Sequence, residues 1–318
     1  MEIHPSSLIP HPSDSIAVLL LAFGGPENLD AVEPFLRNIL VGRPITSELV
    51  ERVKSRYALI GDKSPLPDIT RRQAQLLEEK LTSSLIPHPS SFRVYVGMRY
   101  WHPFIKEIVK KIHEDGIERI IALPMAALNS KASTGGYIDA LNKAVEEFSG
   151  LNVKVIGAWN RNSFYIQAVA DTVKAALAEF PEERRNGVQV IFSAHSLPKR
   201  TVEGDPYEAQ LRETIEDVVK TVGTMNWHLA YQSKGQAPGE WLGPEVELVM
   251  EGLAKEGKKD VLIVPIGFVC DHVETLYDID IVFKKKADEL GMNFKRAASL
   301  NDSPAFIEAL ADIVKSSL

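Results

Sequence analysis

The fold is decided by the stretch IAVLLLAF at residues 16–23, an uninterrupted apolar run that ends at Gly24 and Gly25. A short run without polar alternation, closed by turn residues, predicts a β-strand that is buried on both faces. Such strands occur mainly in parallel sheets, because helices then cover both faces of the sheet. The stretch therefore indicates an α/β fold.

The rest of the chain alternates similar apolar runs with amphipathic segments. Besides residues 16–23, we expect strands at Phe92–Gly97, Arg119–Pro124, Val153–Ile156, Val188–Ala194, Trp227–Tyr231, Val261–Pro265 and Asn293–Arg296. We expect helices at stretches such as Asp68–Leu81, Pro103–Glu114, Ser163–Glu179 and Tyr207–Val222. With four strands in each half, the pattern predicts two doubly wound, Rossmann-like domains, each a four-stranded parallel sheet flanked by helices.

We place the two domains at residues 1–158 and 159–318, with a loose leader over residues 1–15. The last helix could pack back on the first domain. The segment SSLIPHPS occurs twice, at Ser6–Ser13 and at Ser83–Ser90, each time before a predicted strand. Its repetition has no functional explanation.

Composition excludes several classes of protein. The formal net charge of -7 argues against a nucleic-acid partner. No apolar run is long enough for a transmembrane segment, and no signal peptide is evident, so we expect a cytoplasmic protein. The single cysteine, Cys270, excludes an internal disulfide and a four-thiolate cluster. No G-x-G-x-x-G follows a strand, which disfavours dinucleotide binding.

Polar and unusual residues concentrate directly after the predicted strands. In open α/β sheets the ligand binds outside the carboxyl ends of the strands, so these residues predict a site in a cleft between the two halves. His195 is the first candidate, because it follows a buried strand in the sequence FSAHSLP. An imidazole at that position can ligate a metal or accept a proton near neutral pH.

The second candidate is the acidic segment DHVETLYDID, residues 271–280. If a helix begins near His272, the carboxylates of Asp271, Glu274 and Asp278 share one face. Like charges stacked in this way destabilise a helix unless they bind something, although a capped, solvated helix is the alternative interpretation. His272 and Glu274 also form an H-x-E, but no P-C-x-x-C follows, which excludes a zinc deaminase.

Six segments together resemble the signatures of the ferrochelatase family, in family order and over nearly the whole chain after the leader. They are LLLAFGGP (19–26), RYALIGDKSPL (56–66), VGMRYWHP (96–103), FSAHSLP (192–198), YQSKGQAPGEWLGP (231–244) and PIGFVCDHVETLYDID (265–280). The sequence GDPY at residues 204–207 and the spacing of the fifth segment are most similar to bacterial coproporphyrin III ferrochelatases. The resemblance implies chelatase-type domains and an enzyme of haem biosynthesis that inserts Fe²⁺ into a porphyrin.

The resemblance also implies roles for individual residues. His195 and Glu274 would be the catalytic and metal-binding pair, and Asp278 would continue an acidic path for protons or incoming metal. The residues implied for porphyrin binding are Phe23, Gly24, Gly25, Arg56, Tyr57, Ser64, Ser130, Ser233 and Trp241. Ferrous iron and porphyrin would be substrates, with no permanently bound cofactor and, since Cys270 is the only thiol, no iron–sulfur cluster. Transient contact with other haem-pathway enzymes is left open.

Among the positions that depart from the family pattern, two concern iron binding. Phe23 stands where related coproporphyrin enzymes often have tyrosine, so a phenolate cannot ligate iron there. The acidic row ends at Val282, where the family usually has another carboxylate.

Other functions remain as alternatives: a chelatase for another tetrapyrrole or metal, such as cobalt and sirohydrochlorin, or a non-catalytic tetrapyrrole carrier. Coproporphyrin III is favoured over protoporphyrin IX.

Overall fold

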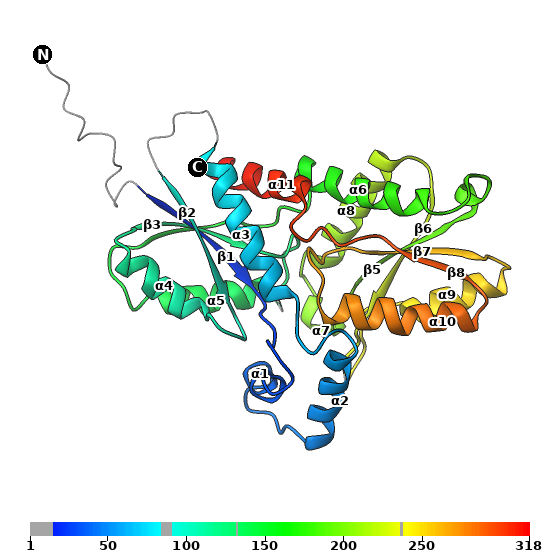
Figure 1. Ribbon diagram of the computed structural model, residues 1–318, viewed down its shortest axis with the longest axis horizontal. Helices are drawn as coiled ribbons and strands as arrows, with labels where there is room; N and C mark the ends of the chain where they lie inside the picture. Colours follow the sequence, from blue (N-terminus) through cyan, green and yellow to red (C-terminus); the bar gives the residue numbers. More distant parts are fainter. Residues whose placement is uncertain (1–14, 84–90, 132, 236–237) are drawn as a thin grey trace, which may run out of the picture.

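The computed structural model describes residues 15–83, 91–131, 133–235 and 238–318 of the 318-residue chain. The predicted leader, apart from Ser15, and the two SSLIPHPS segments, apart from Ser83, lie outside the described residues. The described chain forms two parallel sheets side by side, with helices on both faces of each (Figure 1). The predicted fold class is therefore confirmed.

The first sheet has the strand order β2-β1-β3-β4, and the second repeats the pattern as β6-β5-β7-β8, with all pairs parallel. The strands are β1 (Ile16–Ala22), β2 (Phe92–Met98), β3 (Arg119–Pro124), β4 (Asn152–Val155), β5 (Gln189–His195), β6 (Asn226–Gln232), β7 (Asp260–Pro265) and β8 (Asn293–Arg296). The predicted strands differ from these by no more than one residue at either end.

Helices follow the strands along the chain. The first half contains α1 (Val32–Ile39), α2 (Ser47–Ala58), α3 (Leu66–Thr82), α4 (Ile105–Glu114) and α5 (Thr134–Val145). The second half contains α6 (Ser163–Ala178), η3 (Glu182–Gly187), α7 (Lys199–Val202), α8 (Tyr207–Val222), α9 (Val246–Lys255), the π-helix η4 (Glu274–Phe283), α10 (Lys284–Glu289) and α11 (Pro304–Lys315). Figure 1 shows α1 and α2 as an arm that projects from the sheets.

One hydrophobic core is shared by the two halves. Side chains alternate across a strand, so Val18 and Leu20 of β1 face one core while Leu19 and Leu21 face another, which is covered by α4 and α5. The core of Val18 and Leu20 also contains Phe192 of β5 and the buried face of α11. The C-terminal helix α11 packs on α3 and α6, and so contacts elements of both halves (Figure 1).

The strand order determines where a ligand can bind. In each sheet the chain leaves the first strand for one neighbour and then crosses to the other side, which makes a switch point between β1 and β3 and between β5 and β7. Loops diverge at a switch point, so the carboxyl ends of those strands are the expected ligand-binding edge. His195 is the last residue of β5, and the segment with Glu274 follows β7. Both therefore lie at the switch point of the second sheet.

Candidate active site

His195 is oriented by its own loop. Its Nδ1 lies 2.6 Å from the carbonyl oxygen of Ser196, which can only accept, so Nδ1 carries the hydrogen. The other ring nitrogen, Nε2, faces the carboxylate of Glu274, with Nε2 and Oε1 separated by 3.3 Å. The side chains of His195 and Glu274 remain 35% and 28% exposed. The structure thus brings the predicted catalytic pair together at an accessible position.

A second histidine shares the same carboxylate. His272 donates from Nδ1 to the Cys270 carbonyl oxygen at 3.1 Å, and its Nε2 lies 3.7 Å from Oε2 of Glu274. The carboxylate therefore lies between the Nε2 atoms of two histidines. Sequence reasoning missed His272 as a site residue, because it treated the H-x-E spacing only as a zinc deaminase motif. The available signal was the short spacing to Glu274 in a loop that follows a buried strand.

The charge states of the pair depend on each other. Burial lowers the pKa of His195, but the charge and hydrogen bond of Glu274 outweigh burial and raise that pKa to about 9. Burial raises the pKa of Glu274, but the two histidines outweigh burial and hold that pKa well below its usual range. At neutral pH the free protein therefore contains an imidazolium beside a carboxylate. The sequence did not show this coupling, because it did not place Glu274 3.3 Å from Nε2 of His195.

The acidic row is shorter than predicted. The helix that carries it starts near His272, as predicted, since the N–H of Leu276 donates to the His272 carbonyl oxygen at 2.9 Å, and it is π-helical from Glu274 through Phe283. Asp278 lies one turn beyond Glu274, and burial together with the Glu274 charge raises its pKa. Asp271 does not belong to the row, since its carboxylate accepts from Ser299 at 2.7 Å and from Arg296 at 3.2 Å. The prediction that Asp271 shares the face of Glu274 was therefore wrong.

Two residues expected near the porphyrin contact the acidic row or its helix. The Ser233 hydroxyl donates to Oδ2 of Asp278 at 2.7 Å. Arg56, from α2 in the first half, places its guanidinium 5.1 Å from the ring centre of Tyr277 in the π-helix. The arm formed by α1 and α2 therefore reaches the segment that carries Glu274 (Figure 1).

Tyr57, beside Arg56 in α2, is buried. Burial and the nearby Glu274 charge raise the pKa of its phenol, so the hydroxyl stays protonated. A protonated phenol can donate a hydrogen bond, which is the chemistry that propionate binding would need.

The loop after β1 packs closely against neighbouring loops of the first half. Gly24 has a φ of 96°, and a Cβ on Gly25 would lie 2.4 Å from the Cβ and Oγ of Ser64. These glycines thus allow the loop to pack closely against Met98, Trp101 and Ser64. Ser64 itself is buried. Phe23 is 40% exposed, and its ring packs 4.7 Å from that of Tyr100.

The remaining predicted residues lie in separate loops. Ser130 is buried, and its backbone N–H donates to Oγ1 of Thr134 at 2.8 Å. Trp241 is half-buried, and a Cβ on Gly235 would lie 2.6 Å from the edge of its ring. Where Ser130 and Trp241 would stand relative to a bound porphyrin stays a prediction, as does the predicted cleft between the halves.

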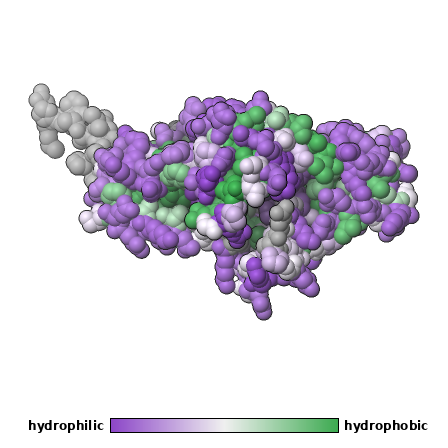
Figure 2. Space-filling view, turned by 90° about the horizontal axis from the view of Figure 1, so that it is seen from below, coloured by the Kyte–Doolittle hydropathy of each residue, from purple (hydrophilic) through white to green (hydrophobic). Residues whose placement is uncertain are grey.

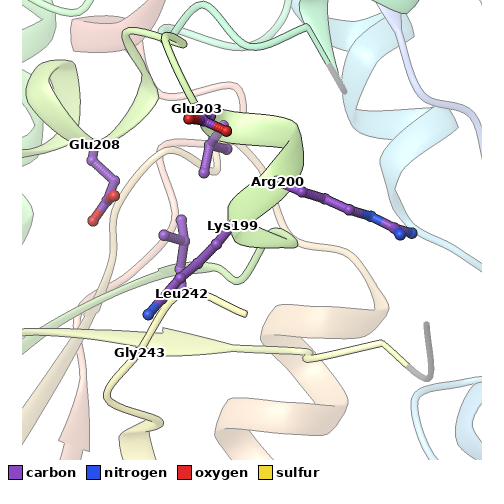
Figure 3. Close-up of a pocket in the computed structure, with 7 residues that line it drawn as sticks. Lys199, Arg200, Glu203, Glu208, Leu242 and Gly243 are labelled. Carbon is purple, nitrogen blue, oxygen red and sulfur yellow. The ribbon is translucent and has the colours of Figure 1, made fainter. Parts of the chain in front are cut away.

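One hollow of about 400 Å³ lies beside α7 (Figure 3). Its lining residues are Lys199, Arg200, Val202, Glu203, Glu208, Leu242 and Gly243. None of these belongs to the predicted site. Glu208 in its lining accepts a hydrogen bond from the hydroxyl of Tyr231 in β6 at 3.1 Å.

Within residues 15–83, 91–131, 133–235 and 238–318, no group of three or more His, Cys, Asp or Glu side chains is arranged to hold a metal ion. No helix in those ranges is long and apolar enough to cross a bilayer.

Seen from the side of the α1–α2 arm, apolar surface gathers near the middle of the molecule, between hydrophilic ends (Figure 2).

Comparisons with known proteins agree with this geometry. The family model described as Ferrochelatase matches residues 15–318. A ferrochelatase from Herpetosiphon aurantiacus is 42% identical over 304 residues, which cover 95% of this chain and 99% of that protein. A coproporphyrin III ferrochelatase from Oceanobacillus iheyensis is 38% identical over 301 residues, covering 94% and 96%.

A solved structure with the same fold is SirB from Bacillus subtilis with Fe³⁺. The superposition covers 95% of this chain and 95% of SirB, with a TM-score of 0.60. At 11% sequence identity this likeness concerns the fold alone. The relatives of high identity span both halves, including the segments with His195 and Glu274. The chain belongs to the ferrochelatase family.

Proposed function

We propose that this chain inserts ferrous iron into a porphyrin at the carboxyl edge of β5 and β7, with His195 and Glu274 acting on the metal and on the pyrrole protons. The observation that carries the proposal is the carboxylate of Glu274 between the Nε2 atoms of His195 and His272, at 3.3 and 3.7 Å. Imidazole and carboxylate together suit a ferrous ion that must be bound and then released.

The reaction requires that two pyrrolic N–H protons leave the porphyrin while Fe²⁺ loses its water and enters the ring. His195 accepts one proton at Nε2 once that atom is free of its own proton. Glu274 and Asp278 lie one turn apart and offer carboxylate oxygens along which protons or the incoming ion can pass. The site must favour a bent macrocycle, since a flat ring hides its nitrogen lone pairs from the metal.

We further propose coproporphyrin III as the preferred substrate. The support is the similarity to the Oceanobacillus iheyensis enzyme, together with the sequence GDPY at residues 204–207. Initial rates with coproporphyrin III and protoporphyrin IX, at equal Fe²⁺ and followed by loss of the free-base spectrum, test the preference. A higher kcat/KM for coproporphyrin III is expected, and a higher value for protoporphyrin IX would reverse the assignment.

The same assay separates the alternatives. The fold likeness to SirB keeps open a chelatase for another tetrapyrrole, so a parallel reaction with Co²⁺ and sirohydrochlorin is included. Turnover there without turnover of Fe²⁺ and porphyrin would favour that activity. A non-catalytic carrier would shift the porphyrin spectrum without replacing it.

We place the reaction in the cytoplasm, with porphyrin and Fe²⁺ as passing substrates and with no resident cofactor. An iron–sulfur cluster in particular is disfavoured, since it would need four thiolates and the single thiol of Cys270 is buried. Partners that deliver iron or accept haem would make transient contacts.

Arg56→Ala should raise the porphyrin KM more than it lowers kcat. The face of the guanidinium stacks on Tyr277 while its N–H edge can bind a propionate, and one charge-assisted hydrogen bond contributes roughly 1.5–3 kcal/mol. We therefore expect KM to rise by roughly tenfold or more. Arg52→Ala, in the exposed part of the same helix, is the matched control. An unchanged KM in Arg56→Ala would remove Arg56 from the porphyrin site.

A further inference from the structure

Arg296 connects two parts of the segment that carries the site. It is the last residue of β8, and its side chain is only 15% exposed. Its Nε and Nη2 donate to the two carboxylate oxygens of Asp280 at 2.6 and 3.0 Å, a bidentate pair. Its Nη1 donates to Oδ1 of Asp271 at 3.2 Å. One guanidinium thus binds both carboxylates, and we call this group the Arg296 clamp.

The two carboxylates of the clamp flank the reacting groups. Asp271 immediately precedes His272, and Asp280 lies within the π-helix beyond Glu274 and Asp278. A π-helix is rare and is usually confined to a single turn inside an α-helix, so a longer stretch needs support from outside its own backbone. The rigid fork of an arginine can fix the distance between two carboxylates, whereas the single ammonium of a lysine cannot.

Further hydrogen bonds hold the Asp271 end of the clamp. Asn301 donates from Nδ2 to Oδ2 of Asp271 at 2.9 Å and accepts the Asp271 backbone N–H at Oδ1, at 2.8 Å. The carbonyl oxygen of Asn301 accepts in turn from Nε2 of Gln73, at 2.6 Å, and Gln73 lies in α3 of the first half. The clamp is therefore anchored to both halves of the molecule.

We propose that Arg296 is a positioning residue that holds the segment Glu274–Phe283 in its π-helical register and so keeps the Glu274 carboxylate between His195 and His272. The predicted effect of Arg296 on kcat rests on the proposed function, whereas its predicted effect on the helix does not. Arg296 acts through Asp271 and Asp280 and leaves porphyrin affinity to other residues.

The test is Arg296→Lys, which keeps the charge but lacks the planar fork that pairs with both oxygens of Asp280 while a further N–H reaches Asp271. Hydrogen exchange followed by mass spectrometry should show faster exchange in peptides that cover residues 274–283. In the Fe²⁺ and porphyrin assay kcat should fall about ten- to a hundredfold, since a displacement of about 1 Å can cost that much, while KM stays within about twofold. Asp280→Asn, which removes the bidentate partner, should give the same result.

The matched control is Lys295→Gln on the same strand, which breaks the ion pair of Lys295 with Glu179 at 2.9 Å. It should leave exchange and kcat unchanged. Unaltered exchange over residues 274–283 in folded Arg296→Lys and Asp280→Asn would overturn the inference, as would a kcat equal to that of an active wild type. If the wild type shows no turnover, the proposed function fails, and the exchange experiment still decides whether the clamp holds the helix.

Discussion

His195→Ala should abolish metal insertion while porphyrin binding survives. Nε2 of His195 is the group that faces Glu274, whereas we expect porphyrin affinity to come from burial of the ring and from propionate contacts made by other residues. A positioned general base contributes about 10²- to 10⁴-fold to a rate, and kcat should fall by that factor. Stopped-flow absorbance with Fe²⁺ measures turnover, and quenching of porphyrin fluorescence measures binding.

The control is His113→Ala, at the exposed end of α4, where the ring only packs against Phe148. This variant should insert iron at the wild-type rate. Turnover near the wild-type value in purified His195→Ala would remove His195 from the catalytic site. Loss of both turnover and binding would show that His195 serves mainly to hold the porphyrin.

Glu274→Gln should lower the pKa of His195 from about 9 towards the ordinary histidine value of about 6.5. The physical reason is that glutamine keeps the shape of the side chain but removes the charge that offsets burial. In the wild type, kcat/KM should rise with pH through about 9, because only unprotonated Nε2 accepts a proton. In Glu274→Gln the maximum rate falls, and the rise shifts to lower pH.

Titration of His195 by NMR measures the same pKa without turnover, with His195→Ala to assign its signal. Since the folded-state pKa of His195 lies above its unfolded value and that of Glu274 lies below its own, the pair stabilises the protein most between about pH 4.5 and 6.5. That stabilisation is lost as the pH rises through about 9. Thermal melts of the wild type should show this loss, and those of Glu274→Gln should not. A wild-type His195 that titrates near 6.5 would contradict the coupling.

Much of the fold could be predicted from local patterns. Uninterrupted apolar runs such as Ile16–Ala22 specify strands buried on both faces, and their order along the chain predicts parallel sheets. The strand limits were accurate because residue types change sharply where each strand leaves the core. The division between residues 158 and 159 stays a prediction, since the core shared by both sheets does not end at a residue number.

The site was predicted only in part. FSAHSLP and the segment after β7 were identified because carboxyl ends of parallel strands meet at one edge. His272 was missed because its spacing to Glu274 was considered only as a zinc deaminase motif. Asp271 was assigned to the wrong face because its carboxylate is held by Arg296 and Ser299, which lie far along the chain.

The sequence by itself determined the fold class and the family signatures, and it selected His195 and Glu274 as site candidates. These depend on residue type and on order along the chain. Only the tertiary structure decided that Glu274 is shared by two histidines and that Arg296 binds Asp271 and Asp280. These contacts join residues far apart in the chain, and their geometry depends on how the two sheets and the π-helix pack. The raised pKa of His195 has the same origin, since it follows from a 3.3 Å contact that no local pattern encodes.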